Sequence, residues 1–372
     1  MRDILGIVNF ENEKVRVEGL SNFRSIPAIS FLGRYRVVDF VLSNMANSGI
    51  DHMKVLIRDK PRSLIEHIGI GSHYNINSKS GSLQILYSDR NITNKLYFTD
   101  VNLLNQHSSY IKHSNQDYVV IAPSYMICKI NYQDVVEQHI KTGADVTAVY
   151  KQIDDGHKRF IGCEEFDIIN NRVTVIKDSH GSTSVKNISL ETYVMHKDFL
   201  LDLIDEASHQ SAAYSIASFL ANNDNIKYIN IQGYKYEGYL ACINSLEEYY
   251  QTNIDLINYE KAKEIFSHDW PVYTKTNDSP PAHYTQRAKV KNCMVANGCV
   301  VQGKIENCIL GRAVKIKKGA VVKNSVILPN AIIGEDAVVE NAVIDKGAKI
   351  IVNKEIIGSK EQIAYVRRGD TI

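Results

Sequence analysis

Three arginines near the amino terminus, Arg16, Arg34 and Arg36, are the first residues in this sequence that could bind a ligand. A guanidinium group presents a planar fork of N–H donors that matches phosphate, so these residues are candidates for binding an anionic effector or a sugar phosphate. Two acidic residues, Glu11 and Glu13, precede them. At about 4 Å and a surface dielectric constant, each contact between a carboxylate and a phosphate charge opposes binding by about 4 kcal/mol before screening. These two carboxylates favour a solvated turn at this point of the chain over a site for phosphate.

Arg36 and Asp39 admit a second interpretation. They are three residues apart, so an ion pair within the chain or a contact at the start of a helix explains them as well as an anion site does. Arg58, Lys60 and Arg62 form another basic group, and a solvated loop accounts for their charges. The sequence leaves open whether these side chains bind a ligand or serve the fold.

The elements that must position these side chains alternate between strands and helices. Four short runs rich in β-branched residues predict buried parallel strands, and two amphipathic segments that end near glycine predict helices. This alternation predicts a Rossmann-like, doubly wound α/β domain over residues 1–265, whose ligands bind beyond the carboxyl ends of the strands. The predicted strands are Ile4–Val8, Val55–Ile57, Tyr118–Ile121 and Val146–Tyr150; the predicted helices are Tyr35–Ser48 and Tyr132–Lys141, with stops at Gly49 and Gly143.

The last part of the chain contains a six-residue repeat. Every sixth residue from Cys308 to Ile356 is apolar, and Asn and Gly fall where corners must turn, some of them with an expected positive φ. A period of six does not suit an α-helix, but it suits a left-handed parallel β-helix in which each face takes six residues. The repeat predicts a β-helix domain over residues 289–372, joined to the first domain by a linker over residues 266–288. The apolar positions are Cys308, Val314, Ala320, Val326, Ile332, Val338, Ile344, Ile350 and Ile356; the predicted corner residues are Asn307, Asn324, Asn330, Asn341, Gly311, Gly319, Gly334 and Gly347.

The β-helix raises the alternative of an acyltransferase. Enzymes of that class resemble one another in using a histidine on or near the coil, and no histidine follows His283 in this sequence. Packing and oligomerisation are therefore the favoured roles for the repeat. Its terminal coil must be capped or paired, because an open sheet edge promotes association.

The composition excludes several other classes of protein. With 43 basic and 42 acidic residues, the formal net charge is +1, so no global field favours nucleic acid or an anionic membrane. No apolar run has the length of a membrane span, and Ile4–Val8 is too short for a signal peptide. The six cysteines have no C-x-x-C spacing, which favours buried free thiols in a reducing cytoplasm over a zinc site. We therefore expect a cytoplasmic protein without a metal of its own.

The block from Arg24 to Phe40, followed by Leu42–Asn44, closely resembles the front of glucose-1-phosphate adenylyltransferase. That enzyme, also called ADP-glucose pyrophosphorylase, supplies ADP-glucose to bacterial glycogen synthesis. Asp269–Thr274 and Ser279–Ala282 are similar to the interdomain segment of the same family. The resemblance therefore spans nearly the whole chain, and it implies the same two-domain fold. In the family, a basic residue at the position of Arg34 takes part in effector binding.

The resemblance also implies where a catalytic chain would carry its reactive groups. Joining a sugar phosphate to a nucleoside triphosphate requires a glycine-rich loop, a lysine near the phosphates and two carboxylates for Mg²⁺. All four requirements fail here: a phenol with a pKa near 10 and a soft thiolate are poor ligands for Mg²⁺. The family's glycines fall on Glu11, Asn12 and Lys14, its lysine on Ile26, and its two aspartates on Tyr125 and Cys242.

These losses predict a pseudo-enzyme that resembles the GlgD type of subunit. Such a chain has no catalytic residues, and Mg²⁺ and ATP are expected only at a catalytic glucose-1-phosphate adenylyltransferase subunit. We expect the two to form a hetero-oligomer, namely a tetramer, in which this chain raises the activity of its partner; a homo-oligomer is the alternative assembly. Two other functions stay open. One is an active sugar-1-phosphate nucleotidyltransferase with non-standard residues, and the other is a sugar-phosphate or nucleotide sensor.

Overall fold

A computed structural model describes residues 3–10, 15–77, 79, 81–87 and 97–372. The chain forms two compact units, each built from separate stretches. The first unit contains the residues up to Val15, Phe40–Leu240 and Trp270–Tyr273; the second contains Arg16–Asp39, Ala241–Asp269 and Thr274–Ile372. The predicted domains and linker, 1–265, 266–288 and 289–372, are consecutive segments of the chain. Each of the two observed units instead collects residues that contact one another.

A mixed, nine-stranded sheet forms the centre of the first unit in the described residues. β1 pairs in parallel with both β4 and β6, while β11 is antiparallel to β6 and β8. The sheet therefore departs from the all-parallel arrangement that the apolar runs suggest. In spatial order its strands are β5 (Ser82–Tyr87), β4 (His52–Ile57), β1 (Ile4–Asn9), β6 (Tyr118–Pro123), β11 (Lys186–His196), β8 (Val146–Ile153), β12 (Ile231–Lys235), β10 (Arg172–Asp178) and β9 (Glu164–Ile169).

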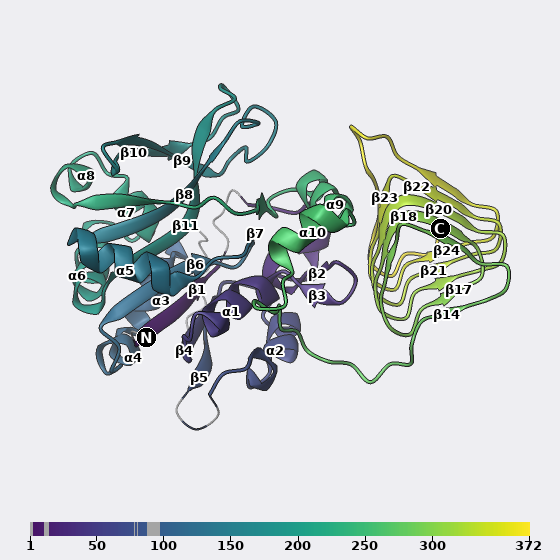
Figure 1. The fold of residues 1–372 in the computed structure, drawn as a ribbon, viewed down its shortest axis with the longest axis horizontal. Coiled ribbons are helices and arrows are strands. Elements are labelled where there is room, and N and C mark those ends of the chain that lie inside the picture. The colour runs from purple at the N-terminus through teal and green to yellow at the C-terminus, as the bar shows by residue number, and fades with distance from the viewer. Residues whose placement is uncertain (1–2, 11–14, 78, 80, 88–96) are drawn as a thin grey trace. The chain divides into compact units, whose positions relative to one another are not determined.

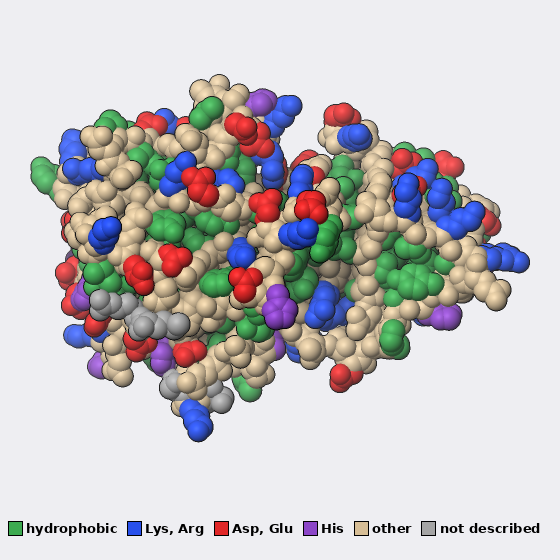
Figure 2. Space-filling view, in the orientation of Figure 1, with side chains coloured by type: hydrophobic (Ala, Val, Ile, Leu, Met, Phe, Trp, Pro, Cys, Tyr) green, Lys and Arg blue, Asp and Glu red, His purple; other side chains and the backbone are tan. Residues whose placement is uncertain are grey.

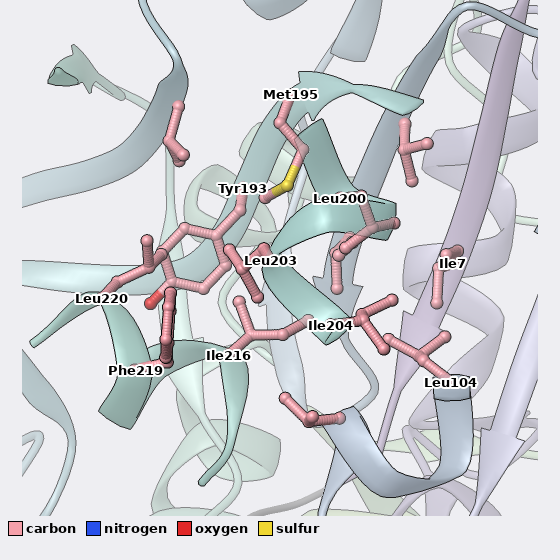
Figure 3. Close-up of a cluster of buried hydrophobic side chains, with 14 of the residues drawn as sticks. Ile7, Leu104, Tyr193, Met195, Leu200, Leu203, Ile204, Ile216, Phe219 and Leu220 are labelled. Atoms are coloured by element: carbon pink, nitrogen blue, oxygen red, sulfur yellow. The ribbon is translucent and has the colours of Figure 1, made fainter. Parts of the chain in front are cut away.

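Helices cover both faces of this sheet, because its strands are apolar on both sides. One face packs against α3, α6 and α7 through a core that includes Ile7 and Met195; Figure 3 shows part of this core, with Tyr193 beside Leu203 and Leu220. α5 packs on the sheet through β8, β11 and β12. The helices are α1 (Val38–Asn47), α2 (Arg62–Ile68), α3 (Asp100–Gln106), α4 (Ser108–Lys112), α5 (Tyr132–Thr142), α6 (Lys197–Gln210), α7 (Ile216–Leu220) and α8 (Asn225–Tyr228), with η3 (Ser72–Tyr74) and the short strands β7 (Met126–Cys128) and β13 (Leu240–Cys242).

The elements predicted for the first domain are present, with ends that differ by a few residues. The four predicted strands correspond to β1, β4, β6 and β8, and the two predicted helices correspond to α1 and α5. Gly49 and Gly143 have φ values of 70° and 63°. Both glycines follow the last residues of their helices, where a left-handed residue ends a helix without steric cost.

A left-handed β-helix dominates the second unit and confirms the prediction from the repeat. Its strands stack in parallel, as the green and yellow layers of Figure 1 show. The strands are β14 (His283–Tyr284), β15 (Lys289–Lys291), β16 (Met294–Val295), β17 (Val300–Val301), β18 (Lys304–Leu310), β19 (Lys315–Ile316), β20 (Val321–Ile327), β21 (Ile332–Ile333), β22 (Val338–Glu340), β23 (Ala342–Ile344), β24 (Lys349–Ile350), β25 (Glu355–Ile357) and β26 (Ala364–Val366).

The inward column of the β-helix does not follow a strict period of six. Lys304 pairs with Val321, and Val321 with Val338, so these coils repeat after 17 residues. One face of each such coil is therefore one residue shorter than the other two. Cys308 lies in the core, but Ile332 and Val338 are only half-buried, since the predicted column has slipped outward by one position. The repeat predicts the fold correctly and the register only locally.

Asparagines turn the corners of the coils, as predicted. Asn307, Asn324, Asn330 and Asn341 all have positive φ. Among the predicted glycines, Gly319 and Gly347 have φ values of 74° and 73°. Gly311 and Gly334 do not have positive φ; their added Cβ atoms would instead meet neighbouring chain within 3 Å.

The amino-terminal stretch of the second unit is fastened to the β-helix by buried polar contacts. Arg24 Nη2 lies 2.6 Å from Asp345 Oδ1, and both side chains are almost completely buried. A second buried contact joins the same stretch to α9, where Asn253 Oδ1 accepts a hydrogen bond from Leu32 N. The remaining elements of this unit are η1 (Leu20–Asn22), η2 (Ile26–Ala28), β2 (Ser30–Phe31), β3 (Tyr35–Arg36), α9 (Leu246–Asp255) and α10 (Tyr259–Ile265).

Charge is evenly distributed on the surface visible in Figure 2, where acidic and basic side chains lie interspersed. This agrees with a formal net charge of +1. In the part of the chain that the structure describes, no helix has the length and apolarity that crossing a membrane would require.

Candidate functional site

A cavity of about 440 Å³ lies in the first unit. Asn9, the last residue of β1, and Arg58, which follows β4, line it, so it lies beside the carboxyl ends of parallel strands. Doubly wound folds bind their ligands at this edge. One wall is aromatic, since the rings of Phe10 and Phe98 have centroids 5.8 Å apart.

Carboxyl groups outnumber cations among the described residues that line the cavity. Hydrogen bonds hold Asp100 in place: Asn9 Nδ2 donates to Oδ2 at 2.7 Å, and the Ile216 backbone N–H donates to Oδ1 at 3.0 Å. The charged lining residues are Arg58, Asp100, Glu164, Lys177, Asp178 and Glu191.

One of the two cations is shared with acidic residues on β9. Lys177 Nζ lies 2.9 Å from Asp167 Oδ1 and 3.6 Å from Glu165 Oε1. Part of its charge is therefore already neutralised. Carboxyl groups therefore dominate the charged lining of the cavity, and each of them opposes a polyanionic ligand when it is ionised.

Glu191 reaches the cavity because of a bulge in β11. The register of β11 against β8 shifts between Ser189 and Thr192, and Glu191 has a φ of 46°. A left-handed backbone is strained for a residue other than glycine, and a bulge redirects a side chain in this way. Tyr125 OH donates to Glu191 Oε1 at 2.5 Å. This short contact holds the carboxyl group at the cavity wall.

Burial raises the pKa of two of these carboxyl groups far above the ordinary range. The pKa of Glu164 is raised to about 8, first by burial and then by the charge of Glu191, against a hydrogen bond from Tyr193 OH at 3.1 Å. The pKa of Glu191 is raised to about 7, again chiefly by burial. The pKa of Asp100 is also raised by burial. Burial therefore disfavours the ionised form of these carboxyl groups, and a phosphate bound beside them would disfavour it further.

Comparison with known proteins shows which families this chain resembles. The model of the nucleotidyl transferase family matches residues 15–218, and that of the GlmU-like, C-terminal hexapeptide family matches residues 280–364. The glycogen biosynthesis protein GlgD of Bacillus subtilis (strain 168) is 33% identical over 320 residues, which cover 86% of this chain and 82% of that protein.

Two further relatives come from Geobacillus stearothermophilus. Its glycogen biosynthesis protein GlgD is 34% identical over 326 residues, covering 86% of this chain and 82% of that protein. Its glucose-1-phosphate adenylyltransferase is 30% identical over 315 residues, covering 83% and 80%. The chain belongs to the glucose-1-phosphate adenylyltransferase family. Within that family it is of the GlgD type.

The resemblance to glucose-1-phosphate adenylyltransferases predicts that the reactive groups of those enzymes correspond here to Ile26, Tyr125 and Cys242. All three side chains are buried in this chain, with at most 1% of each exposed. Glu11, Asn12 and Lys14, the predicted positions of the lost glycine loop, lie outside the described residues. The sequence interpretation of those three residues stays a prediction.

The residues at the family's two aspartate positions do not fit Mg²⁺. The Tyr125 hydroxyl donates its proton to a carboxylate, and a phenol of this kind is a poor ligand for a hard cation. Cys242 offers a thiol, which suits soft metals instead. Among the described residues, the cavity carboxyl groups do not bring three ligand atoms within 4.8 Å of one another. We therefore assign no reaction step through a metal in this chain.

A second candidate surface lies around Arg34 in the second unit, and the family resemblance predicts an effector-binding role for this residue. Arg34 is exposed on the turn between β2 and β3, where Gly33 has a φ of 77°. A shallow cavity of about 390 Å³ is lined by Arg34, Tyr35 and Phe266, among others. The pKa of Arg312 is lowered, first by burial and then by the positive charge of Arg34, while the negative charge of Asp39 raises it. Asp39 therefore already offsets part of the repulsion between the two arginines.

The other two predicted arginines are placed differently. Arg36 N donates to Asp39 Oδ2 at 2.8 Å near the start of α1, and Arg36 Nη1 donates to Ala28 O at 3.2 Å. This favours the helix-start interpretation for Arg36 and Asp39. Arg16 is exposed, and it is not among the residues that line the cavity beside Arg34.

Sequence reasoning missed the acidic residues of the cavity. Glu164, Asp178 and Glu191 lie on three consecutive strands, β9, β10 and β11, but only the pairing of these strands places their side chains at one cavity. The one available signal is a glutamate inside the apolar run of β11, which is unusual for a buried strand. Arg312 was missed for a similar reason, since its position beside Arg34 depends on the coiling of the β-helix.

Proposed function

We propose that this chain is a regulatory, catalytically deficient subunit that acts in glycogen biosynthesis by raising the activity of a catalytic glucose-1-phosphate adenylyltransferase. The acidic cavity is the observation that carries this proposal. A transferase must hold two phosphate-bearing substrates, and its catalysis is largely the neutralisation of their charge. Here the corresponding edge of the sheet carries four carboxyl groups, two of them with strongly raised pKa values.

The relatives support the same proposal from a second direction. Two of them are named glycogen biosynthesis protein GlgD, and others are named glucose-1-phosphate adenylyltransferase. A chain that keeps the fold of an enzyme can associate with that enzyme through equivalent surfaces. We propose a hetero-oligomer, namely a tetramer, in which contact with this chain favours the competent conformation of the catalytic subunit. Couplings of this kind typically amount to about 1–3 kcal/mol, or about 5- to 150-fold in an equilibrium.

Steady-state kinetics of a catalytic partner, with and without this chain, tests the proposal. ADP-glucose formation from ATP and glucose 1-phosphate should rise when the chain is added and should saturate at a fixed subunit ratio. The chain alone, with Mg²⁺ and both substrates, should form no ADP-glucose. A preparation that is active alone would support the alternative of a transferase with non-standard residues.

Co-elution separates the two remaining functions. If the chain and the catalytic partner co-elute from a size-exclusion column, the result supports the subunit proposal. If they elute apart and calorimetry detects binding of ATP or a sugar phosphate to this chain, the sensor alternative replaces it. A homo-oligomer of this chain that dissociates on addition of the partner agrees with the subunit proposal.

We propose in addition that Arg34 and Arg312 bind an anionic effector of the assembly. The support is the lowered pKa of Arg312 beside Arg34 and the shallow cavity next to Arg34. Arg34→Gln and Arg312→Gln should each weaken activation by a phosphate-bearing effector about tenfold or more, since each removes a charged hydrogen bond. Arg287→Gln, an exposed arginine elsewhere on the β-helix, is the matched control. Equal effects of all three changes would show that the anion responds only to general positive charge.

A further inference from the structure

Two cysteines face each other across the first two coils of the β-helix. Lys291 pairs with Glu306, and Met294 pairs with Ile309, both with a spacing of 15 residues. Cys293 therefore lies in register above Cys308. The neighbouring asparagines confirm this stacking, because Asn292 Nδ2 donates to Asn307 Oδ1 at 2.8 Å.

The two thiols also point the same way. Cys293 Sγ donates to Lys291 O at 3.1 Å, and Cys308 Sγ donates to Glu306 O at 3.1 Å. Each sulfur thus contacts the carbonyl two residues before it. Parallel strands are about 4.7–4.9 Å apart, and a disulfide joins Cα atoms about 4.4–6.8 Å apart. Small rotations of the two side chains are enough to join the sulfurs.

Cys293 and Cys308 differ in burial, and this difference suits an oxidation in two steps. Cys308 belongs to the core of the β-helix and is fully buried, whereas Cys293 is half-buried in the first coil. Within the described residues, β15 and β16 pair on one side only, with β18. A small reagent can therefore reach Cys293 at the end of the coil, while Cys308 is shielded behind it.

The pKa shifts of the two thiols agree with this difference in access. The pKa of Cys293 is lowered chiefly by a hydrogen bond with Cys308, against burial and the negative charge of Glu306. The pKa of Cys308 is raised chiefly by burial. The thiolate is the nucleophilic form of cysteine, so Cys293 is the attacking group. The other titratable groups near Cys293 are Lys291, which pairs with Glu306 at 2.8 Å, and Tyr284.

We propose that Cys293 and Cys308 form a redox-modification site, in which a peroxide oxidises Cys293 and Cys308 converts the product into a disulfide between the first two coils. In the first step the Cys293 thiolate attacks one peroxide oxygen, the O–O bond breaks, and the departing oxygen takes a proton as an alcohol or water. Cys293 is left as a sulfenic acid. In the second step Cys308 sulfur attacks the Cys293 sulfur, the S–O bond breaks, and hydroxide leaves with the Cys308 proton as water. Two thiols are oxidised and one peroxide is reduced.

The disulfide would fasten the terminal coil of the β-helix. Lys289, Val290 and Lys291 of β15 are all exposed, and β15 is held by its pairing with β18. A covalent link between Cys293 and Cys308 closes a short loop, which restricts opening of this coil. Oxidation should therefore protect the first coil, independently of any partner subunit or effector.

Mass spectrometry of the full chain after treatment with tert-butyl hydroperoxide tests this site. The intact mass should fall by two hydrogens per chain, and a nonreducing digest should contain a linked peptide with Cys293 and Cys308. The Cys299→Ser variant is the matched control, since this thiol is buried in the same β-helix, and it should form the same link. Cys293→Ser should form no link.

Two further variants make the result decisive. Cys308→Ala should stop at a Cys293 sulfenic acid that dimedone traps, and Cys308→Val serves the same purpose if the smaller side chain destabilises the core. Hydrogen exchange of amides 289–295 should slow after oxidation in the original chain and stay unchanged in Cys293→Ser. Over-oxidation of Cys293 to sulfinic acid without a link, or a link between two chains, would overturn the proposal.

Discussion

The cavity of the first unit and the arginine surface of the second unit differ in almost every physical respect. The cavity is lined by strands of the sheet and by α3 and α7, is rich in carboxyl groups and is held by internal hydrogen bonds, as at Asp100 and Glu191. The surface around Arg34 is open, and its turn contains a glycine with positive φ. Carboxyl groups dominate the charged residues of the first region, and an exposed arginine marks the second.

This contrast separates residues that hold the fold from residues that line a cavity. The buried pair of Arg24 and Asp345 fastens the amino-terminal stretch of the second unit to the β-helix, so it serves the fold of that unit. The charged residues of the cavity contribute to a local charge balance instead. Changing a residue that holds the fold lowers the free energy of unfolding, whereas changing a residue that contacts only a ligand need not. The predictions below separate these two kinds of residue, from the largest expected effect to the smallest.

Removing the buried cation of the second unit should have the largest effect. Arg24→Ala leaves Asp345 as an uncompensated buried carboxylate, and breaking such a pair costs about 3–5 kcal/mol. Denaturant unfolding of the second unit should register this loss. Lys291→Ala breaks the exposed pair with Glu306 and should lower stability far less, because solvent screens an exposed pair. Similar losses for the two changes would contradict the anchoring role of Arg24.

Neutralising the cavity should admit phosphate. At pH 8, above the raised pKa of about 7 for Glu191, the double change Glu191→Gln and Asp178→Asn removes two negative charges from the wall and keeps an acceptor for the Tyr125 hydroxyl. Calorimetric affinity for glucose 1-phosphate should rise about tenfold or more, since each like-charge contact opposes binding. Asp202→Asn, on the exposed side of α6, provides the control. An unchanged affinity would mean that charge is not what excludes phosphate from the cavity.

The stability of the first unit should fall as the pH rises. The pKa values of Glu164 and Glu191 are raised to about 8 and 7, above the ordinary value near 4.5 in the unfolded chain. The folded state therefore keeps protons that the unfolded state has lost, and this stabilisation is complete below pH 4.5 and disappears as the pH passes 7 and 8. Melting temperature measured from pH 6 to 9 should drop by a few degrees more than in a variant carrying Glu164→Gln and Glu191→Gln. Glu206→Gln on α6 should follow the original chain, and a steeper fall in the double variant would refute the assignment.

Relieving the repulsion at the arginine surface should have the smallest effect. Arg34→Gln removes the charge that lowers the pKa of Arg312, so it should stabilise the second unit by up to about 0.5 kcal/mol without ligand. Added inorganic phosphate should raise the melting temperature of the original chain more than that of the variant, because binding stabilises the folded state. Thermal melts with and without phosphate measure both effects. Destabilisation by Arg34→Gln in the absence of phosphate would argue for a structural role.

Predictions from the sequence were most accurate where a local pattern repeats. The strands β1, β4, β6 and β8 and the β-helix follow from short apolar runs and from the six-residue period. The same period failed at Ile332 and Val338, because a coil of 17 residues has one short face that a regular count cannot locate. For Arg36 and Asp39 the sequence left two interpretations open, and the structure favours the helix-start contact, which involves neighbours in the chain.

The sequence by itself determined the fold class and the family, since each depends on residue identity at known spacing; the replacement of the reactive groups stays its prediction. Tertiary structure alone decided that Glu164, Asp178 and Glu191 meet in one cavity and that Arg312 feels the charge of Arg34. The pairing of strands in the sheet and the stacking of coils decide which side chains share a site. Burial at those meeting points sets the charge of each group, because the free energy of ionisation depends on the surrounding atoms and not on the order of residues.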